Sequence, residues 1–197
     1  MEKEKPVEVL FGDIKMNYNS IDKCECRNGL GWGVTLYVQG CHFHCKGCFN
    51  PETWDFYGGK KFTEKTRDTI LKLLELNQMK HFTIQGGEPL EACNVAELNN
   101  LVDSVKAKRP DIKIWIYTGY KIEELIEYLL FNSMTHENYY PDTYNLIKIL
   151  DKIDYLVDGQ FQEDKKDLTY PFAGSTNQRV IAMQESRKQN KIVLLDI

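Results

Sequence analysis

The 197-residue sequence lacks the features of a membrane, secreted or nucleic-acid-binding protein. No apolar run approaches the length that spans a bilayer, and the first residues contain no apolar signal-peptide core. Basic residues are not in excess, because 25 Lys and Arg stand against 29 Asp and Glu. These absences predict a cytoplasmic protein that has no contact with a membrane and does not bind nucleic acid directly.

The six cysteines are the next constraint on the class of protein. A small secreted chain would use them for disulfides, whereas this longer chain has no signal peptide and clusters its cysteines, which favours metal binding. The length predicts one domain over residues 1–197, with residues 1–27 as a possible N-terminal extension. The composition, 42% hydrophobic and 27% charged, is that of an ordinary globular protein.

Apolar periodicity divides the chain into alternating strands and helices. Strands rich in β-branched and aromatic residues are expected at residues 34–38, 81–85, 112–117 and 154–157. Helices with apolar residues at helical spacing are expected at residues 63–76, 94–108, 123–131 and 143–150. The remaining segments are a polar loop and two late strands, expected at residues 132–142, 179–183 and 192–195.

The alternation of strands and helices predicts an α/β fold, in which helical crossovers connect parallel strands. The sheet is then either open or an incomplete barrel, and in both cases ligands bind at the carboxyl ends of the strands. The cysteine loop and residues 86–88, 118–120 and 158–159 each follow an expected strand directly. We therefore expect these four segments to share one rim of the sheet.

Cys41, Cys45 and Cys48 form a C-x-x-x-C-x-x-C triplet after the first expected strand. Thiolates are the protein ligands of iron–sulfur clusters, most of which take four. Three thiolates on one loop therefore favour a cluster with one iron that lacks a protein ligand. A structural zinc site with His42 or His44 as its fourth ligand is the alternative, although zinc sites usually use C-x-x-C pairs.

Five segments, taken in order, resemble the radical S-adenosylmethionine superfamily and, within it, the activating enzymes of anaerobic (class III) ribonucleotide reductase. The cysteine triplet with its flanks occupies residues 40–54, and a Gly-Gly-Glu-Pro turn follows at 86–89. The other three are Tyr-Thr-Gly-Tyr at 117–120, Val-Asp-Gly-x-Phe at 157–161 and Gly-Ser-x-Asn-Gln-Arg at 174–179. The resemblance runs over most of the chain.

The resemblance implies a fold, two cofactors and a reaction. The fold is an incomplete β/α barrel, and Cys41, Cys45 and Cys48 hold a 4Fe–4S cluster that reductively cleaves S-adenosylmethionine. The radical that forms abstracts a hydrogen atom from a glycine of anaerobic ribonucleoside-triphosphate reductase, which is the implied partner. An electron donor such as a flavodoxin or a ferredoxin is the second implied partner.

The resemblance also implies roles for residues outside the cysteine loop. In the family, the Gly-Gly-Glu segment contacts the ammonium group of the cosubstrate, which assigns that role to Gly86, Gly87 and Glu88. The other expected cosubstrate-binding residues are Phe49, Thr118, Tyr120 and Asp158. Core packing is an equal interpretation for Phe49, and a simple Asp-Gly turn for Asp158.

The sequence departs from the family before the first strand, where relatives often have Asn-Gly-Pro-Gly-x-Arg. Here residues 28–33 read Asn-Gly-Leu-Gly-Trp-Gly, so the arginine is missing, and Arg27 and Arg179 are conceivable substitutes. Cys24, Cys26 and Cys93 are additional cysteines with no assigned role.

Two other functions compete with this interpretation. One is a radical S-adenosylmethionine enzyme with a small-molecule substrate, similar to a deazapurine synthase. The other is a non-catalytic interaction domain stabilised by a metal.

Overall fold

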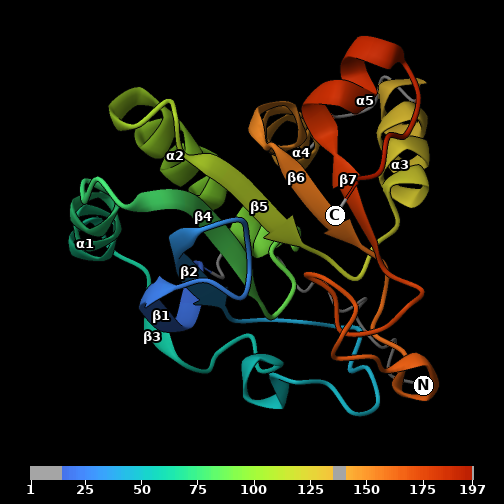
Figure 1. Cartoon of the computed structure of the whole chain (residues 1–197), viewed down its shortest axis with the longest axis horizontal. Coiled ribbons are helices and arrows are strands. Elements are labelled where there is room, and N and C mark those ends of the chain that lie inside the picture. The colour runs from blue at the N-terminus through green and yellow to red at the C-terminus, as the bar shows by residue number, and fades with distance from the viewer. Residues whose placement is uncertain (1–14, 135–140, 197) are drawn as a thin grey trace, which may run out of the picture.

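The computed structural model describes residues 15–134 and 141–196. Within these ranges the strands form one seven-stranded sheet, in the order β3-β1-β2-β4-β5-β6-β7 (Figure 1). Their bounds are β1 Asn17–Glu25, β2 Trp32–Val38, β3 Lys60–Lys61, β4 Met79–Gly86, β5 Lys113–Tyr117, β6 Tyr155–Asp158 and β7 Arg179–Ala182. The fold is therefore α/β with a mixed sheet.

The four central strands run parallel, as the alternation predicts. β2 pairs with β4, β4 with β5 and β5 with β6, all in the parallel sense. Both ends of the sheet are antiparallel, because β1 pairs with β2 and β3, and β7 pairs with β6. The carboxyl ends of the central strands therefore share one rim, and residues 39–50, 86–88, 118–120 and 158–159 leave from it.

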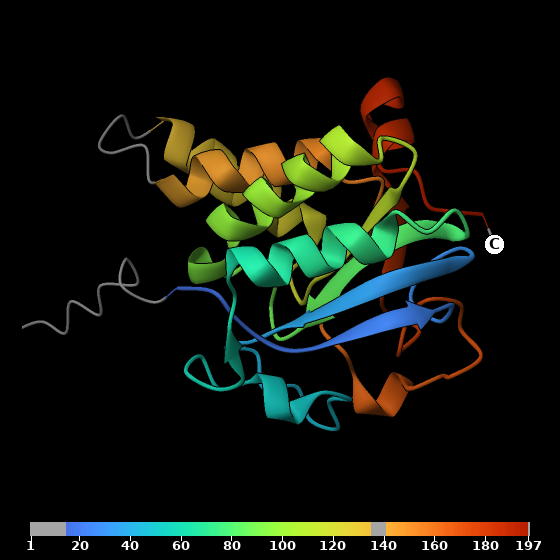
Figure 2. The same ribbon diagram turned by 90° about the vertical axis from the view of Figure 1, so that its left-hand side faces the viewer.

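Helices α1 to α4 cover one face of the sheet, while residues 50–58 and 160–178 lie across the other (Figure 2). The described helices are α1 Glu64–Leu74, α2 Ala92–Lys108, α3 Ile122–Met134, α4 Pro141–Lys152 and α5 Met183–Gln189. Two short 3-10 turns, η2 Pro51–Thr53 and η3 Glu163–Lys165, occur in the loops. No described helix is long and apolar enough to cross a bilayer.

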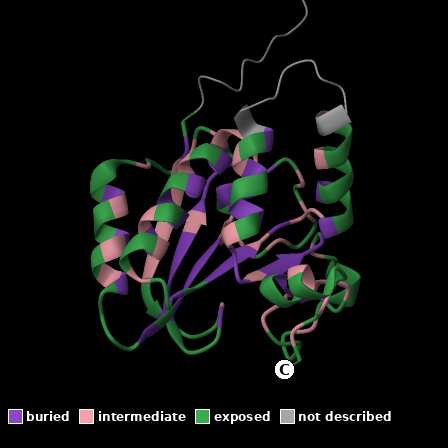
Figure 3. Cartoon of the chain, turned by 90° about the horizontal axis from the view of Figure 1, so that it is seen from above, coloured by how far each residue is buried: buried purple, intermediate pink, exposed green. Residues whose placement is uncertain are grey.

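Strand alternation separates an apolar core from a more polar face. On β2, Val34, Leu36 and Val38 are buried in the main core, together with apolar residues of the helices. Thr35 lies on the opposite face of that strand, and His81 and Thr83 occupy the same face of β4 because they pair with Gly33 and Thr35. Figure 3 shows that the central strands are mostly buried and the outer helix surfaces exposed.

Several local predictions are confirmed and others are wrong. Thr63 caps α1 through a capping box with Thr66, as its position suggests, although the helix ends at Leu74 instead of residue 76. Residues 192–195 are not a strand, because only Leu194 forms an isolated bridge, to Ile181. The late strand β7 ends at Ala182, where α5 begins.

The loop expected at 132–142 is corrected at both ends. α3 continues to Met134 and α4 starts at Pro141, so α4 is longer than the helix expected at 143–150. The middle of that loop, residues 135–140, lies outside the described residues. Of the expected N-terminal extension, residues 17–25 form β1, while residues 1–14 lie outside the described part.

Candidate functional site

The cysteine loop leaves β2 through backbone conformations that favour glycine. Gly40 and Gly47 have φ values of 88° and 73°, and His44 adopts φ of 46° between them. A Cβ on Gly40 would lie 2.6 Å from the Phe56 ring. The main-chain N–H of Cys48 donates to the carbonyl of Cys45 at 3.1 Å, which closes a tight turn. The loop is thereby compact enough to place all three cysteines on one side.

Cys41, Cys45 and Cys48 all line one cavity of about 650 Å³ on the polar face of the sheet. Cys41 is buried and the other two are partly exposed. Burial raises the pKa of the Cys41 thiol to about 11 and also raises that of Cys45. Both thiols are therefore protonated in the metal-free chain at neutral pH, and metal binding must release those protons.

The donor set fits an iron–sulfur cluster better than it fits zinc. His42 and His44, the candidates for a fourth zinc ligand, have other contacts: His42 Nδ1 lies 2.5 Å from Glu91 Oε1, and the His44 ring packs 4.7 Å from Trp54. No three His, Cys, Asp or Glu side chains in the described ranges are grouped so as to hold a single ion. The three thiols are soft ligands suited to iron–sulfur binding.

The turn after β4 is joined to the cysteine loop through the main chain. The N–H of Gly87 donates to the carbonyl of Val38 at 2.9 Å, and that of Glu88 to the carbonyl of Gly40 at 2.7 Å. Gly86 has φ of 107°, and a Cβ on Gly87 would lie 2.5 Å from the Gly40 carbonyl oxygen. The two glycines therefore allow this turn to approach the end of β2 and the start of the cysteine loop.

The carboxyl group of Glu88 is buried and fully engaged within the chain. Oε1 accepts hydrogen bonds from Leu90 N and Thr118 Oγ1, both at 2.8 Å, and Oε2 accepts one from Gly119 N at 2.7 Å. Burial raises the pKa of Glu88 to about 7 despite these bonds. Glu88 thus joins the turn after β4 to the turn after β5.

Residues 118–120 complete this part of the rim. Thr118 Oγ1 donates to Glu88 and accepts from Tyr120 N at 3.1 Å. Gly119 packs on the ring of Phe43, where a Cβ would lie only 2.5 Å away. Thr118 lines the large cavity, together with Gly86, Gly87 and Glu88. Four residues that are expected to bind the cosubstrate therefore line the same cavity as the cysteines: Gly86, Gly87, Glu88 and Thr118.

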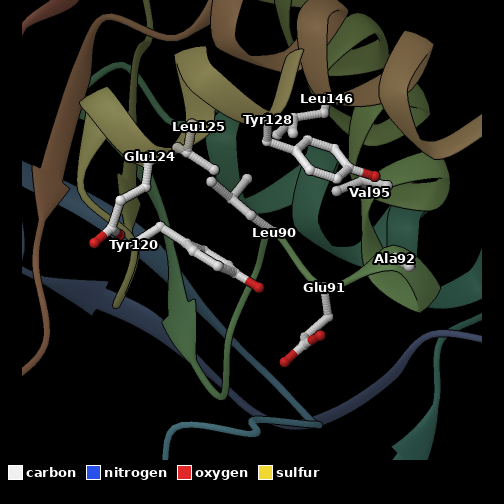
Figure 4. A pocket seen from close by; sticks show the side chains of 9 residues that line it. All are labelled: Leu90, Glu91, Ala92, Val95, Tyr120, Glu124, Leu125, Tyr128 and Leu146. Atoms are coloured by element: carbon white, nitrogen blue, oxygen red, sulfur yellow. The ribbon is translucent and has the colours of Figure 1, made fainter. Parts of the chain in front are cut away.

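Tyr120 belongs to a different, smaller cavity of about 300 Å³ between helices α2, α3 and α4. Its ring packs 4.9 Å from that of Phe43, and burial raises the pKa of its hydroxyl. Figure 4 shows its hydroxyl and the carboxylate of Glu91 on one side of Leu90, with Leu125 on the other side, and all four residues line this cavity. The expectation that Tyr120 binds the cosubstrate stays a prediction.

Phe49 and Asp158 have different positions relative to the large cavity. Phe49 lines it, half exposed, with its ring 5.0 Å from that of Phe161. Asp158 is buried, accepts from Ile122 N at 2.9 Å and binds the guanidinium of Arg179. Its carboxylate anchors the start of α3, and its role toward the cosubstrate stays a prediction.

Sequence reasoning missed Tyr37 and Gln85, which line the cavity away from the cysteines, whereas Tyr117 was an expected residue of the adenosine pocket, with core packing as an equally good interpretation. Tyr37 and Gln85 lie one residue before the ends of β2 and β4, and Tyr117 is the last residue of β5. Residues of the covering loop between 168 and 174 line the same cavity. Strand alternation contained the signal for these three residues, because each follows Thr35, Thr83 or Trp115 by two positions. Nothing in the sequence pattern indicated that the covering loop folds over this face.

The chain matches a known protein family over most of its length. Residues 27–181 match the family model described as "4Fe-4S single cluster domain". A named relative in Escherichia coli strain K12, an anaerobic ribonucleoside-triphosphate reductase-activating protein, is 35% identical over 84% of this chain and 97% of its own.

Further relatives bear the same name. The protein from Pasteurella multocida is 37% identical over 83% of this chain and 95% of its own. That from enterobacteria phage T4 is 33% identical over 84% and 93%, respectively. The chain belongs to the family of anaerobic ribonucleoside-triphosphate reductase-activating proteins.

Proposed function

We propose that the chain is a radical S-adenosylmethionine enzyme that generates a glycyl radical on anaerobic ribonucleoside-triphosphate reductase. Cys41, Cys45 and Cys48 would hold a 4Fe–4S cluster, and residues 86–88 would bind the cosubstrate. One observation carries the proposal: the three thiols and that turn line the same cavity of about 650 Å³. The names of the relatives supply the reductase as partner.

When bound, the cluster would supply one electron to break the sulfonium carbon–sulfur bond of S-adenosylmethionine, releasing methionine and a deoxyadenosyl radical that takes a hydrogen atom from glycine. The chain itself has two tasks in this reaction. The cysteine loop must deprotonate to bind iron, and the turn at 86–88 must hold the cosubstrate beside it. The donor of that electron is proposed to be a flavodoxin or a ferredoxin.

The proposal extends to the fold. We place β2, β4, β5 and β6 as parallel strands of an incomplete β/α barrel, with α1 to α4 outside and the cavity inside. The position of the cysteines after β2 supports this arrangement, because active sites of such barrels lie at the carboxyl ends of strands. A cavity that extends along the polar face is suited to a protein segment as substrate.

Anaerobic reconstitution with iron and sulfide tests the site. The wild-type protein should show cluster absorbance and, when reduced with dithionite, an electron paramagnetic resonance signal. Cys45→Ala should lose the cluster signal, because the other two cysteines on the loop leave two irons without protein ligands. The matched control is Cys24→Ala, which removes an exposed thiol outside the loop and should keep full iron content.

The reaction is tested by adding S-adenosylmethionine and purified reductase to the reduced protein. We expect 5′-deoxyadenosine and methionine in equal amounts, together with the doublet of a glycyl radical on the reductase. A colourless protein that binds only zinc would overturn the proposal. Cluster assembly with cosubstrate cleavage but no radical on the reductase would retain the chemistry and reject the partner.

A further inference from the structure

The large cavity has one cationic residue in its described lining, Arg27. The only carboxylate residue in that lining is Glu88, whose side chain is buried and engaged with its own neighbours. An anionic group that enters the cavity therefore meets one positive charge, at the end formed by β1 and β2. Arg27 precedes β2, whereas the cysteines follow it.

Arg179 is not an equivalent cation. Its Nη1 and Nη2 donate to the two carboxylate oxygens of Glu123 at 2.9 and 2.7 Å, and its Nε donates to Asp158 at 2.9 Å. The guanidinium of Arg179 is therefore already paired with two carboxylates. Arg179 is also not among the described residues that line the large cavity. Of the two arginines that the sequence offers as substitutes, the structure brings only Arg27 to the site.

The main chain at Arg27 is held by a buried carboxylate. Glu25 Oε2 accepts hydrogen bonds from the N–H groups of Arg27 and Asn28 at 2.7 and 3.1 Å. Its Oε1 accepts from Thr35 Oγ1 at 2.6 Å, which ties the turn to β2. Because the contact from Arg27 comes from its backbone N–H, any residue except proline can keep it at this position.

The turn that follows is folded over the buried ring of His81. A Cβ on Gly29 or Gly33 would lie 2.7 or 2.3 Å from ring atoms of His81. The carbonyl of Asn28 accepts from Thr83 Oγ1 at 2.7 Å. These contacts explain Gly29 and Gly33 and attach the turn after Arg27 to β4.

The guanidinium of Arg27 is available to a ligand. Its side chain is 74% exposed, and Asp22, at 3.3 Å, is its ion-pair partner. Asp22 also accepts a hydrogen bond from the hydroxyl of Tyr37, another residue of the cavity lining, at 3.2 Å. An exposed pair of this length is weak, so an incoming carboxylate can compete with Asp22.

We propose that Arg27 binds a carboxylate of the reductase segment that enters this cavity, which makes it a specificity-determining residue for the partner. The inference rests on the proposed function. The planar guanidinium suits two-point binding of a carboxylate. Asp22 pairs with Thr35 in the middle of β2, whereas the cysteine loop starts beyond Val38. Under the proposed function the cosubstrate's ammonium group lies at residues 86–88, and its carboxylate is bonded to the same carbon atom, so it lies at the cysteine end and leaves Arg27 to the partner.

The test measures binding of full-length reductase to the reconstituted, iron-containing protein by anaerobic titration calorimetry. Arg27→Gln should weaken binding about tenfold, because a charge-assisted contact is lost, and should lessen its dependence on salt. Lys72→Gln is the matched charge control, since Lys72 is exposed on α1 on the opposite face of the sheet, and should bind as the wild type does. Asp22→Asn, which removes the competing carboxylate, should bind at least as tightly.

A second set of measurements, with S-adenosylmethionine, distinguishes a carboxylate of the reductase from that of the cosubstrate. Arg27→Gln should bind S-adenosylmethionine with unchanged affinity and, without reductase, release 5′-deoxyadenosine at the wild-type rate. Weaker cosubstrate binding with unchanged reductase binding would overturn the inference, as would no change in either. If the wild type itself cleaves no cosubstrate, the proposed function fails, and that result is visible before any variant is compared.

Discussion

The buried carboxyl group of Glu88 predicts how stability depends on pH. Its pKa is about 7 in the folded chain against an ordinary value of 4.5, because burial disfavours the charged form. Between these values the folded chain keeps a proton that the unfolded chain has lost. The contribution to stability is therefore full below pH ~4.5 and is lost as the pH rises through about 7. The shift corresponds to roughly 3 kcal/mol at most.

Glu88→Gln removes this titration and keeps the shape of the side chain. Both carboxylate oxygens accept main-chain N–H groups, from Leu90 and from Gly119. The amide NH₂ of glutamine must replace one oxygen, so it faces an N–H donor in either orientation, at a cost of about 1–3 kcal/mol. The variant should be less stable than the wild type at pH 5, and the deficit should shrink or reverse by pH 8.

Urea unfolding of the iron-free, reduced proteins at pH 5, 6, 7 and 8 measures the difference in free energy of unfolding. The dependence on urea should be equal in the two proteins, so that midpoints can be compared. Glu127→Gln, on the exposed surface of α3, is the matched control, and its free energy of unfolding should change with pH as that of the wild type does. A constant gap between Glu88→Gln and wild type across this range would refute the raised pKa.

Three further changes test packing around the site. Gly87→Ala places a methyl group 2.5 Å from the Gly40 carbonyl oxygen, so it should destabilise the chain by about 1–3 kcal/mol in urea; full stability would show that the turn can move away. In Gly33→Ala the new Cβ lies 2.3 Å from the His81 ring, so the free energy of unfolding in urea should fall by a similar amount, about 1–3 kcal/mol. Wild-type stability of this variant in urea would count against the packed turn. Arg179→Met leaves Asp158 buried without its cation, at about 3–5 kcal/mol; a loss below about 1 kcal/mol would mean that the pair is solvent-screened.

The central strands and long helices were predictable because their side chains alternate between a buried and a less buried face. β5 has buried Ile114 and Ile116 on the helix side, and α2 buries Leu98, Leu101, Val102 and Val105 at helical spacing. Strand β1 was missed because its sequence, Asn-Tyr-Asn-Ser-Ile-Asp-Lys-Cys-Glu, is mostly polar. Its partly exposed residues need little hydrophobic burial, since pairing with β2 and β3 satisfies the main chain.

The direction of β7 could not be read from the sequence. A helix between two strands indicates a parallel crossover, but residues 159–178 contain no long helix. Val180 pairs with Val157 in an antiparallel register, which only the folded sheet reveals.

The members of the candidate site were predictable as separate loops, and their mutual contacts were not. The order of strands indicated that the cysteine loop and residues 86–88 leave from one rim. The bonds from Thr118 and Gly119 to Glu88 depend on β4 lying beside β5. The pattern Gly-Gly-Glu indicated ligand contact, while the structure shows that Gly87 also approaches the Gly40 carbonyl.

The hydrogen bonds from Gly87 to Val38 and from Glu88 to Gly40 involve main-chain atoms only. The spacing between the thiol-bearing segment and the Gly-Gly-Glu turn is consequently set during folding. A molecule that contacts both segments binds to a preorganised frame, so its binding free energy is reduced little by the cost of ordering the protein. Surface side chains nearby can therefore change without altering that frame.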